Sequence, residues 1–137
     1  MLTAIDHAHD LLRGLHAIAD AVLDAAPARA PARLAAATML EADLRESVER
    51  LGLDGIGREV VQRFLLEYQE SLHSISDVRV RSLGRTRAER GAALRRDGEE
   101  AHARCLIALS GIASLLREAQ RADPDVATRP HHGQRFA

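Results

Sequence analysis

Apolar residues recur every three or four positions through most of this chain, which is the spacing of one face of an α-helix. Four stretches show it, over residues 3–26, 31–51, 56–75 and 86–122. Short segments containing proline or glycine separate them. The pattern predicts an all-α protein. Four amphipathic helices joined by short connections favour an up-down-up-down four-helix bundle.

Residues with known capping preferences mark the ends of the predicted helices. Thr3 and Asp6 have the spacing of a capping box, with Asp in place of the usual Glu, and Thr86 opens a second box. Gly52 follows the second stretch as a C-terminal stop, and Asp54 is placed to cap the third helix. These local signals give the same boundaries as the apolar spacing.

The apolar pattern weakens between the third and fourth stretches. Large apolar residues become sparse after Ile75, and Gly84 is expected to end the third helix. We read a single fourth helix over residues 86–122; the alternative is a short helix that ends near Arg96 and a second that starts at Asp97. Because the last two helices are longer than the first two, their joined ends should extend past the bundle as a basic helical hairpin.

Positive charge is concentrated in this hairpin. Residues 79–96 contain seven arginines and one acid, Glu89, so the segment carries +6 in a chain whose net charge is −1. Such a segment attracts phosphate groups or an acidic protein surface. No aromatic residue lies in it to stack on bases, and the remaining charge of −7 would repel a duplex. An acidic protein partner is therefore favoured over nucleic acid.

Small residues occupy most of the inner-face positions in the same region. They are Ala88, Gly91, Gly98, Ala101 and Cys105. Small side chains let another helix approach closely, since the distance between packed helices depends on the side chains at the contact. The arginines around them would then meet acids on that helix.

Together, the charge and the small residues predict a non-enzymatic protein–protein interaction module. It would be an oligomerising adaptor, a small helical chaperone or a subunit of a larger assembly. The predicted contact residues are Arg79, Arg81, Arg85, Arg87, Arg90, Gly91, Leu94, Arg95 and Gly98. The partner is another protein or a second copy of the chain. Nucleic-acid or polyphosphate binding through the same hairpin is the alternative, and no metal or cofactor is expected.

Two Glu-x-x-His pairs have the spacing by which di-metal carboxylate bundles supply ligands. They are Glu70 with His73 and Glu99 with His102. On a helical wheel the first pair points to solvent, and the first two helices offer no glutamate on their apolar faces. Because the ligands of such a centre project into the bundle, a di-metal site is disfavoured.

Arg96 and His102 suggest a second enzymatic hypothesis. Their spacing resembles that of the Arg and His residues in the RNA-cleaving HEPN helical domains. The resemblance implies a site at a dimer interface, with His102 as general acid/base and Arg96 as phosphate clamp. Positions six apart on a regular helix lie about 120° apart, so a break at Gly98 would be needed to bring the two side chains together.

Length and composition set the expected organisation. A chain of 137 residues fits one domain, with the bundle over residues 1–122 and a flexible tail over residues 123–137, which lack periodicity. The lone Cys105 lies in an apolar run and is expected to be a small buried residue. The N-terminus lacks a basic signal region and no apolar run could span a bilayer. A soluble cytoplasmic protein is therefore expected.

Overall fold

The computed structural model describes residues 3–24, 29–81 and 94–129. Four long helices contain most of these residues: α1 (Ala4–Asp24), α2 (Ala30–Leu51), α3 (Gly55–Arg81) and α5 (Glu99–Ala122). A π-helical turn, η3 (Leu94–Gly98), leads into α5, and a 3₁₀ helix, η4 (Pro124–Thr128), follows it. The all-α prediction is confirmed.

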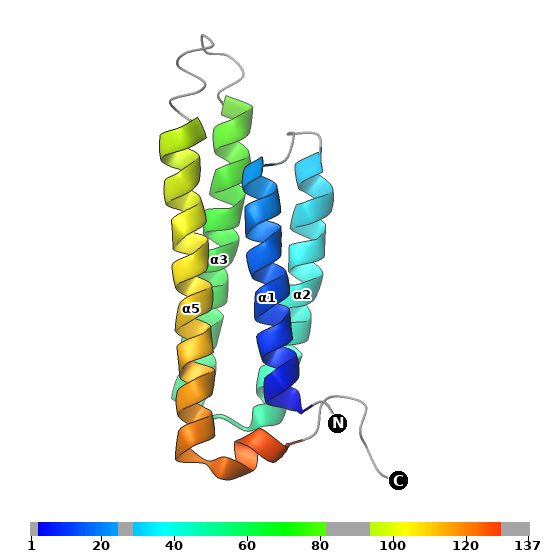
Figure 1. The fold of residues 1–137 in the computed structure, drawn as a ribbon, viewed down its shortest axis with the longest axis vertical. Helices are drawn as coiled ribbons and strands as arrows, with labels where there is room; N and C mark the ends of the chain where they lie inside the picture. Colours follow the sequence, from blue (N-terminus) through cyan, green and yellow to red (C-terminus); the bar gives the residue numbers. More distant parts are fainter. Residues whose placement is uncertain (1–2, 25–28, 82–93, 130–137) are drawn as a thin grey trace.

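Consecutive long helices run in opposite directions (Figure 1). α1 and α3 start at the end of the bundle where α5 finishes, and α2 and α5 run back towards that end. The most extensive contacts join α1 to α2 and α3 to α5, and α1 also packs along α5. Contacts between α2 and α3 are fewer. The bundle therefore consists of two helical pairs joined mainly along the seam between α1 and α5.

The core is built from the apolar faces that the sequence pattern predicts. Its largest fully buried side chains come from all four helices and include Leu15, Leu44, Tyr68 and Ile112. Each buried aliphatic or aromatic side chain contributes about 1.5–3 kcal/mol relative to exposure. The buried Tyr68 hydroxyl donates a hydrogen bond to the carbonyl oxygen of Leu15 at 2.6 Å.

The predicted caps are present at the ends of the first three helices. Thr3 Oγ1 accepts a hydrogen bond from the N–H of Asp6 at 3.2 Å and donates one to the Asp6 carboxylate at 2.7 Å. Gly52 ends α2 in the left-handed region, with φ of 68°, where a side chain would be strained. Asp54 Oδ1 accepts a hydrogen bond from the N–H of Gly57 at 2.6 Å. These sequence predictions are confirmed.

The described part of the fourth helical region is continuous. η3 passes directly into α5, and Gly98 has right-handed helical angles with no side-chain cap. The alternative in which a new helix starts at a capping Asp97 is therefore wrong. The expected helix end at Gly84, the capping box at Thr86 and the tip of the hairpin lie outside the described residues.

The first half of the expected C-terminal tail is folded against the bundle. Asp123 Oδ1 accepts a hydrogen bond from the N–H of Asp125 at 3.0 Å, which starts η4. Val126 is only 3% exposed and belongs to the core. The carbonyl oxygen of Arg129 accepts a hydrogen bond from the N–H of Ala4 at 2.9 Å. Residues 124–129 therefore close the end of the bundle, and residues 130–137 lie outside the described part.

Candidate functional site

The structure places the nine predicted contact residues in three groups. Four of them lie outside the described residues: Arg85, Arg87, Arg90 and Gly91. Four lie on described backbone at the end of α3 or in η3: Arg79, Arg81, Leu94 and Arg95. The ninth, Gly98, is buried. Because α3 contacts η3, both flanks of the arginine-rich segment lie side by side at one end of the bundle (Figure 1).

Arg96 is an arginine of this segment whose side chain is described. It is 73% exposed, and its Nε lies 3.8 Å from the carboxylate of the adjacent Asp97. An exposed ion pair at this distance contributes little to stability. The Arg96 guanidinium is therefore accessible to a partner at the end of the bundle.

The described small residues of the fourth helical region face the interior of their own bundle. Ala101 and Cys105 are fully buried, and a Cβ placed on Gly98 would lie 3.3 Å from Leu23 Cδ1 of α1. The close approach that small residues permit is thus used by α1. Gly98 is therefore corrected from a contact residue for an external helix to a position of internal packing.

A groove of about 460 Å³ runs along the outer side of the α3/α5 pair. It is lined by Glu67, Glu70, Ser71, Ser74, Arg104 and Ile107. Ile107 is 67% exposed and places a large aliphatic side chain among these charged and polar groups. An exposed apolar side chain beside charged and polar groups is a combination found in protein interfaces.

Two histidines converge on one aspartate at the seam between α1 and α5. The Nε2 of His102 lies 2.6 Å from Asp20 Oδ1, and the Nδ1 of His16 lies 3.3 Å from Asp20 Oδ2. An ionised carboxylate only accepts hydrogen bonds, so His102 donates through Nε2. This hydrogen bond lowers the pKa of Asp20, and His16 acts in the same direction. The His16–Asp20 pair joins residues one helical turn apart on α1, whereas the contribution of His102 depends on tertiary packing.

The structure does not unite the residues of the two enzymatic hypotheses. Glu70 and His73 are exposed, as predicted. Arg96 pairs with Asp97 and His102 with Asp20, and no contact between Arg96 and His102 is present in the described part of the chain. Within the same part, no group of three or more His, Cys, Asp or Glu side chains is arranged to hold a metal ion.

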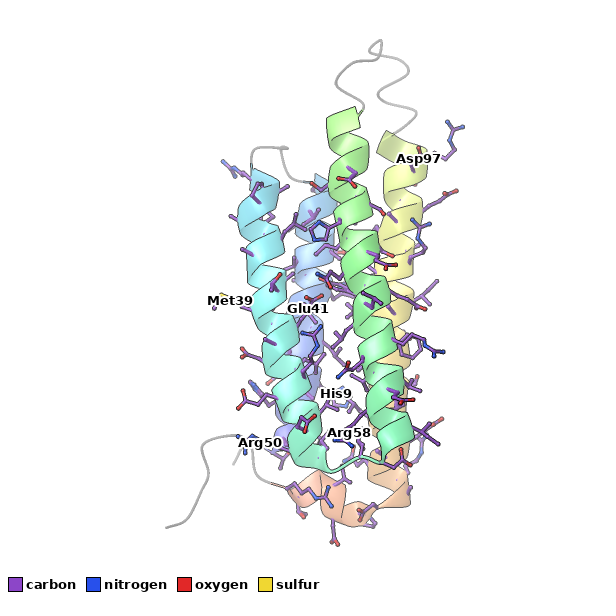
Figure 2. The ribbon with its side chains drawn as sticks, turned by 180° about the vertical axis from the view of Figure 1, so that it is seen from behind. His9, Met39, Glu41, Arg50, Arg58 and Asp97 are labelled. Atoms are coloured by element: carbon purple, nitrogen blue, oxygen red, sulfur yellow. The ribbon has the colours of Figure 1, made fainter. Side chains whose placement is uncertain are left out.

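Glu41 corrects the prediction that the first two helices carry no glutamate on their apolar faces. It is 2% exposed on the inner side of α2 (Figure 2). Its Oε1 atom is buried without a hydrogen-bond partner among the described residues. Burial raises the pKa of Glu41, and the nearby Arg45 acts against this rise. The spacing from Ala37 to Glu41 and on to Leu44 was the available signal, because it continues the apolar stripe.

Cys105 is the small buried residue that the sequence predicts. Its Sγ lies 3.7 Å from the carbonyl oxygen of Tyr68. Burial raises the pKa of its thiol to about 12, so the thiol is protonated and unreactive at neutral pH. Cys105 therefore has a packing role in this bundle.

Comparison with known proteins assigns the chain to no family. No family model, no curated protein and no solved structure matches the chain. Among the described helices, none is long and apolar enough to cross a membrane.

Proposed function

We propose that this chain is a non-enzymatic protein–protein interaction module that binds an acidic protein surface through the arginine-bearing end of its α3/α5 pair. The observation that carries the proposal is the contact between α3 and η3. This contact holds both flanks of a segment with a net charge of +6 at one end of the bundle. The arginines of the two flanks, Arg79, Arg81, Arg95 and Arg96, are therefore on neighbouring backbone at this end.

The chemistry of arginine favours a carboxylate-bearing partner. The guanidinium forms paired, charge-assisted hydrogen bonds with carboxylates. The exposed Arg96 shows that a described member of the segment faces solvent. Because the rest of the chain carries −7, the molecule has a charge asymmetry that would orient an acidic partner towards this end during association.

Ile107 supplies an apolar contact on the same helical pair. It follows Arg96 by eleven residues, or about 16 Å along a helix. A partner segment lying along the outer groove between α3 and α5 could therefore contact both Ile107 and the arginine-bearing end. Arg104, at the rim of this groove, would pair with an acid on the partner.

Native mass spectrometry of the untagged protein, taken from its own host in low and then high salt, tests this proposal. We expect a discrete added protein mass that survives moderate salt. Replacing Arg85, Arg87 and Arg90 together by Gln should slow association at low salt and make its rate less sensitive to salt, because fewer charges remain to be screened. Ile107→Ser should weaken the complex about tenfold, as for a central interface residue.

Ile56→Ser is the matched control, because Ile56 is 74% exposed but lies at the opposite end of α3. It should leave the complex unchanged. Equal effects of Ile107→Ser and Ile56→Ser would contradict the assignment of the groove. A heterogeneous nucleic-acid mass that salt removes would instead support the alternative of phosphate binding.

A further inference from the structure

A second groove lies on the other side of α5, along its seam with α1. Its volume is about 560 Å³, within the range of small-molecule sites. Its lining is supplied equally by the two helices: His9, Leu12, Arg13 and His16 from α1, and Leu106, Leu109, Ser110 and Ala113 from α5. The floor is apolar, since Leu12 and Leu109 are buried and Leu106 and Ala113 are half-buried.

One end of this groove has a positive electrostatic character. Burial lowers the pKa of His9, and the nearby guanidinium groups of Arg117 and Arg13 lower it further. Asp6 and Asp10 act in the opposite direction, but each acts less than either arginine. The lining of the groove itself includes the Arg13 guanidinium and no carboxylate. An anion placed there would be attracted.

Arg117 follows Ala113 by one helical turn on α5, just beyond the residues that line the groove, and its charge acts on the His9 ring. Arg13 forms an ion pair with Asp10 on its own helix. Arg117 donates a hydrogen bond to Ser114 Oγ at 3.3 Å and forms no ion pair among the described residues. Its guanidinium therefore retains donors for an external carboxylate.

His16 lines the opposite end of the groove. His16 is held by Asp20, which also accepts the hydrogen bond from His102. His9 and His16 are seven residues apart, so the apolar floor between the two ends is about 10 Å long. One end thus attracts an anion, and the floor would cover an apolar chain.

We infer that the groove between α1 and α5 binds a small amphipathic monocarboxylate, with the carboxylate at His9 and Arg117 and its apolar chain over Leu12 and Leu109. The placement satisfies the donors of Arg117 and removes apolar surface of Leu106 and Ala113 from water. This site lies on a different seam from the proposed protein-binding surface. Carboxylate binding in this groove therefore does not depend on the proposed protein-binding function.

Octanoate is a suitable probe, because its chain matches the length of the floor. Titration of the full chain, followed by NMR of the histidine rings and the Ala113 methyl group, should give saturable shifts at both places. The dissociation constant should be on the order of 1 mM or tighter for a ligand of this size. Because a bound carboxylate favours the charged imidazolium, octanoate should also raise the pKa of His9.

Two comparisons separate the roles of head group and chain. Acetate lacks the chain and octanol lacks the charge, so each should bind at least about tenfold more weakly than octanoate. Arg117→Gln should weaken octanoate binding about tenfold through the lost charged hydrogen bond. Ala113→Leu should abolish binding by filling the floor, and its unfolding midpoint would show that the bundle is retained.

Arg104→Gln is the matched control, because Arg104 is an exposed arginine of α5 that lines the other groove. It should bind octanoate as the wild type does. The inference is overturned if octanoate gives no saturable shift at His9 and Ala113, if Arg117→Gln and Arg104→Gln behave alike, or if octanol binds as well as octanoate.

Discussion

α1 and α2 are neighbouring antiparallel helices of 21 and 22 residues, but they contribute different inner faces to the same core. All eight buried residues of α1 are apolar. The seven buried residues of α2 include Glu41 and Ser47, and its first half adds only the alanines Ala30 and Ala37. Large apolar residues on the inner face of α2 are concentrated in its second half.

The two helices also differ in the other helices that they contact. α1 packs extensively on α2 and along α5, whereas α2 has extensive contact with α1 and less with α3. α2 also directs Met39, which is 70% exposed, away from the bundle (Figure 2). α1 therefore makes more extensive contacts in the bundle than α2, and Glu41 is a buried position at which the packing of α2 can be improved.

The largest expected effect is the loss of a core side chain from α1. Leu15 is fully buried, so Leu15→Ala should lower the free energy of unfolding by about 3 kcal/mol. Chemical denaturation followed by circular dichroism measures this change. Leu66→Ala, the same deletion at a side chain that is 53% exposed on α3, should change it by less than about 1 kcal/mol. Similar losses for the two variants would show that Leu15 of α1 contributes no more to the core than an exposed leucine does.

A change of opposite sign is expected on the inner face of α2. Glu41→Leu removes a buried carboxyl whose Oε1 has no partner among the described residues. It should raise the free energy of unfolding by about 2 kcal/mol, since apolar replacements of buried charged groups are often stabilising. Asp43→Leu, at an exposed position of the same helix, should change it by no more than about 0.5 kcal/mol. Destabilisation by Glu41→Leu would mean that the carboxyl has an important partner.

The ionisation of Glu41 should make stability depend on pH. Burial raises its pKa above the ordinary value of 4.5, so the native state binds this proton more tightly than the unfolded state. The stabilisation is complete below pH 4.5 and is lost as the pH rises through the raised native pKa. The unfolding free energy of the wild type, minus that of the Glu41→Gln variant, should therefore fall as the pH increases. Asp20, whose lowered pKa has the opposite effect, is present in both proteins and cancels.

Much of the α1/α2 pair could be predicted from the sequence because its determinants are local. Helical spacing gives the apolar face of α1, and the caps at Thr3 and Gly52 act on residues within one turn. Glu41 is an exception to a common rule, because carboxylates are seldom fully buried. The spacing of the apolar residues places Glu41 on the inner face of α2, whereas the usual preference of glutamate for solvent places it on the outer face. Only the packed structure decides between the two.

The candidate sites depended more heavily on tertiary structure. The sequence shows that Gly98 and Ala101 are small, but it does not show that α1 fills the space beside them. In the same way, the contact between Asp20 and His102 joins residues 82 positions apart, for which a single sequence carries no periodic signal. The net charge of +6 over residues 79–96 can instead be read directly from the sequence. The structure adds only the positions of the residues on either side of this segment.

The smallest effect tests whether Tyr68 interacts with α1 or with α2. Its hydroxyl donates to the Leu15 carbonyl of α1 at 2.6 Å, whereas Glu41 of α2 is close enough to help raise the Tyr68 pKa. Tyr68→Phe should lower the free energy of unfolding by about 1 kcal/mol, the net value of one hydrogen bond. The same loss should occur in a Glu41→Gln background, to within about 0.5 kcal/mol, because the acceptor of the hydroxyl among the described residues lies on α1. A coupling well above that value in this double-mutant cycle would mean that the hydroxyl also satisfies Glu41. The buried polar group of α2 would then be part of the packing that holds α3 to α1.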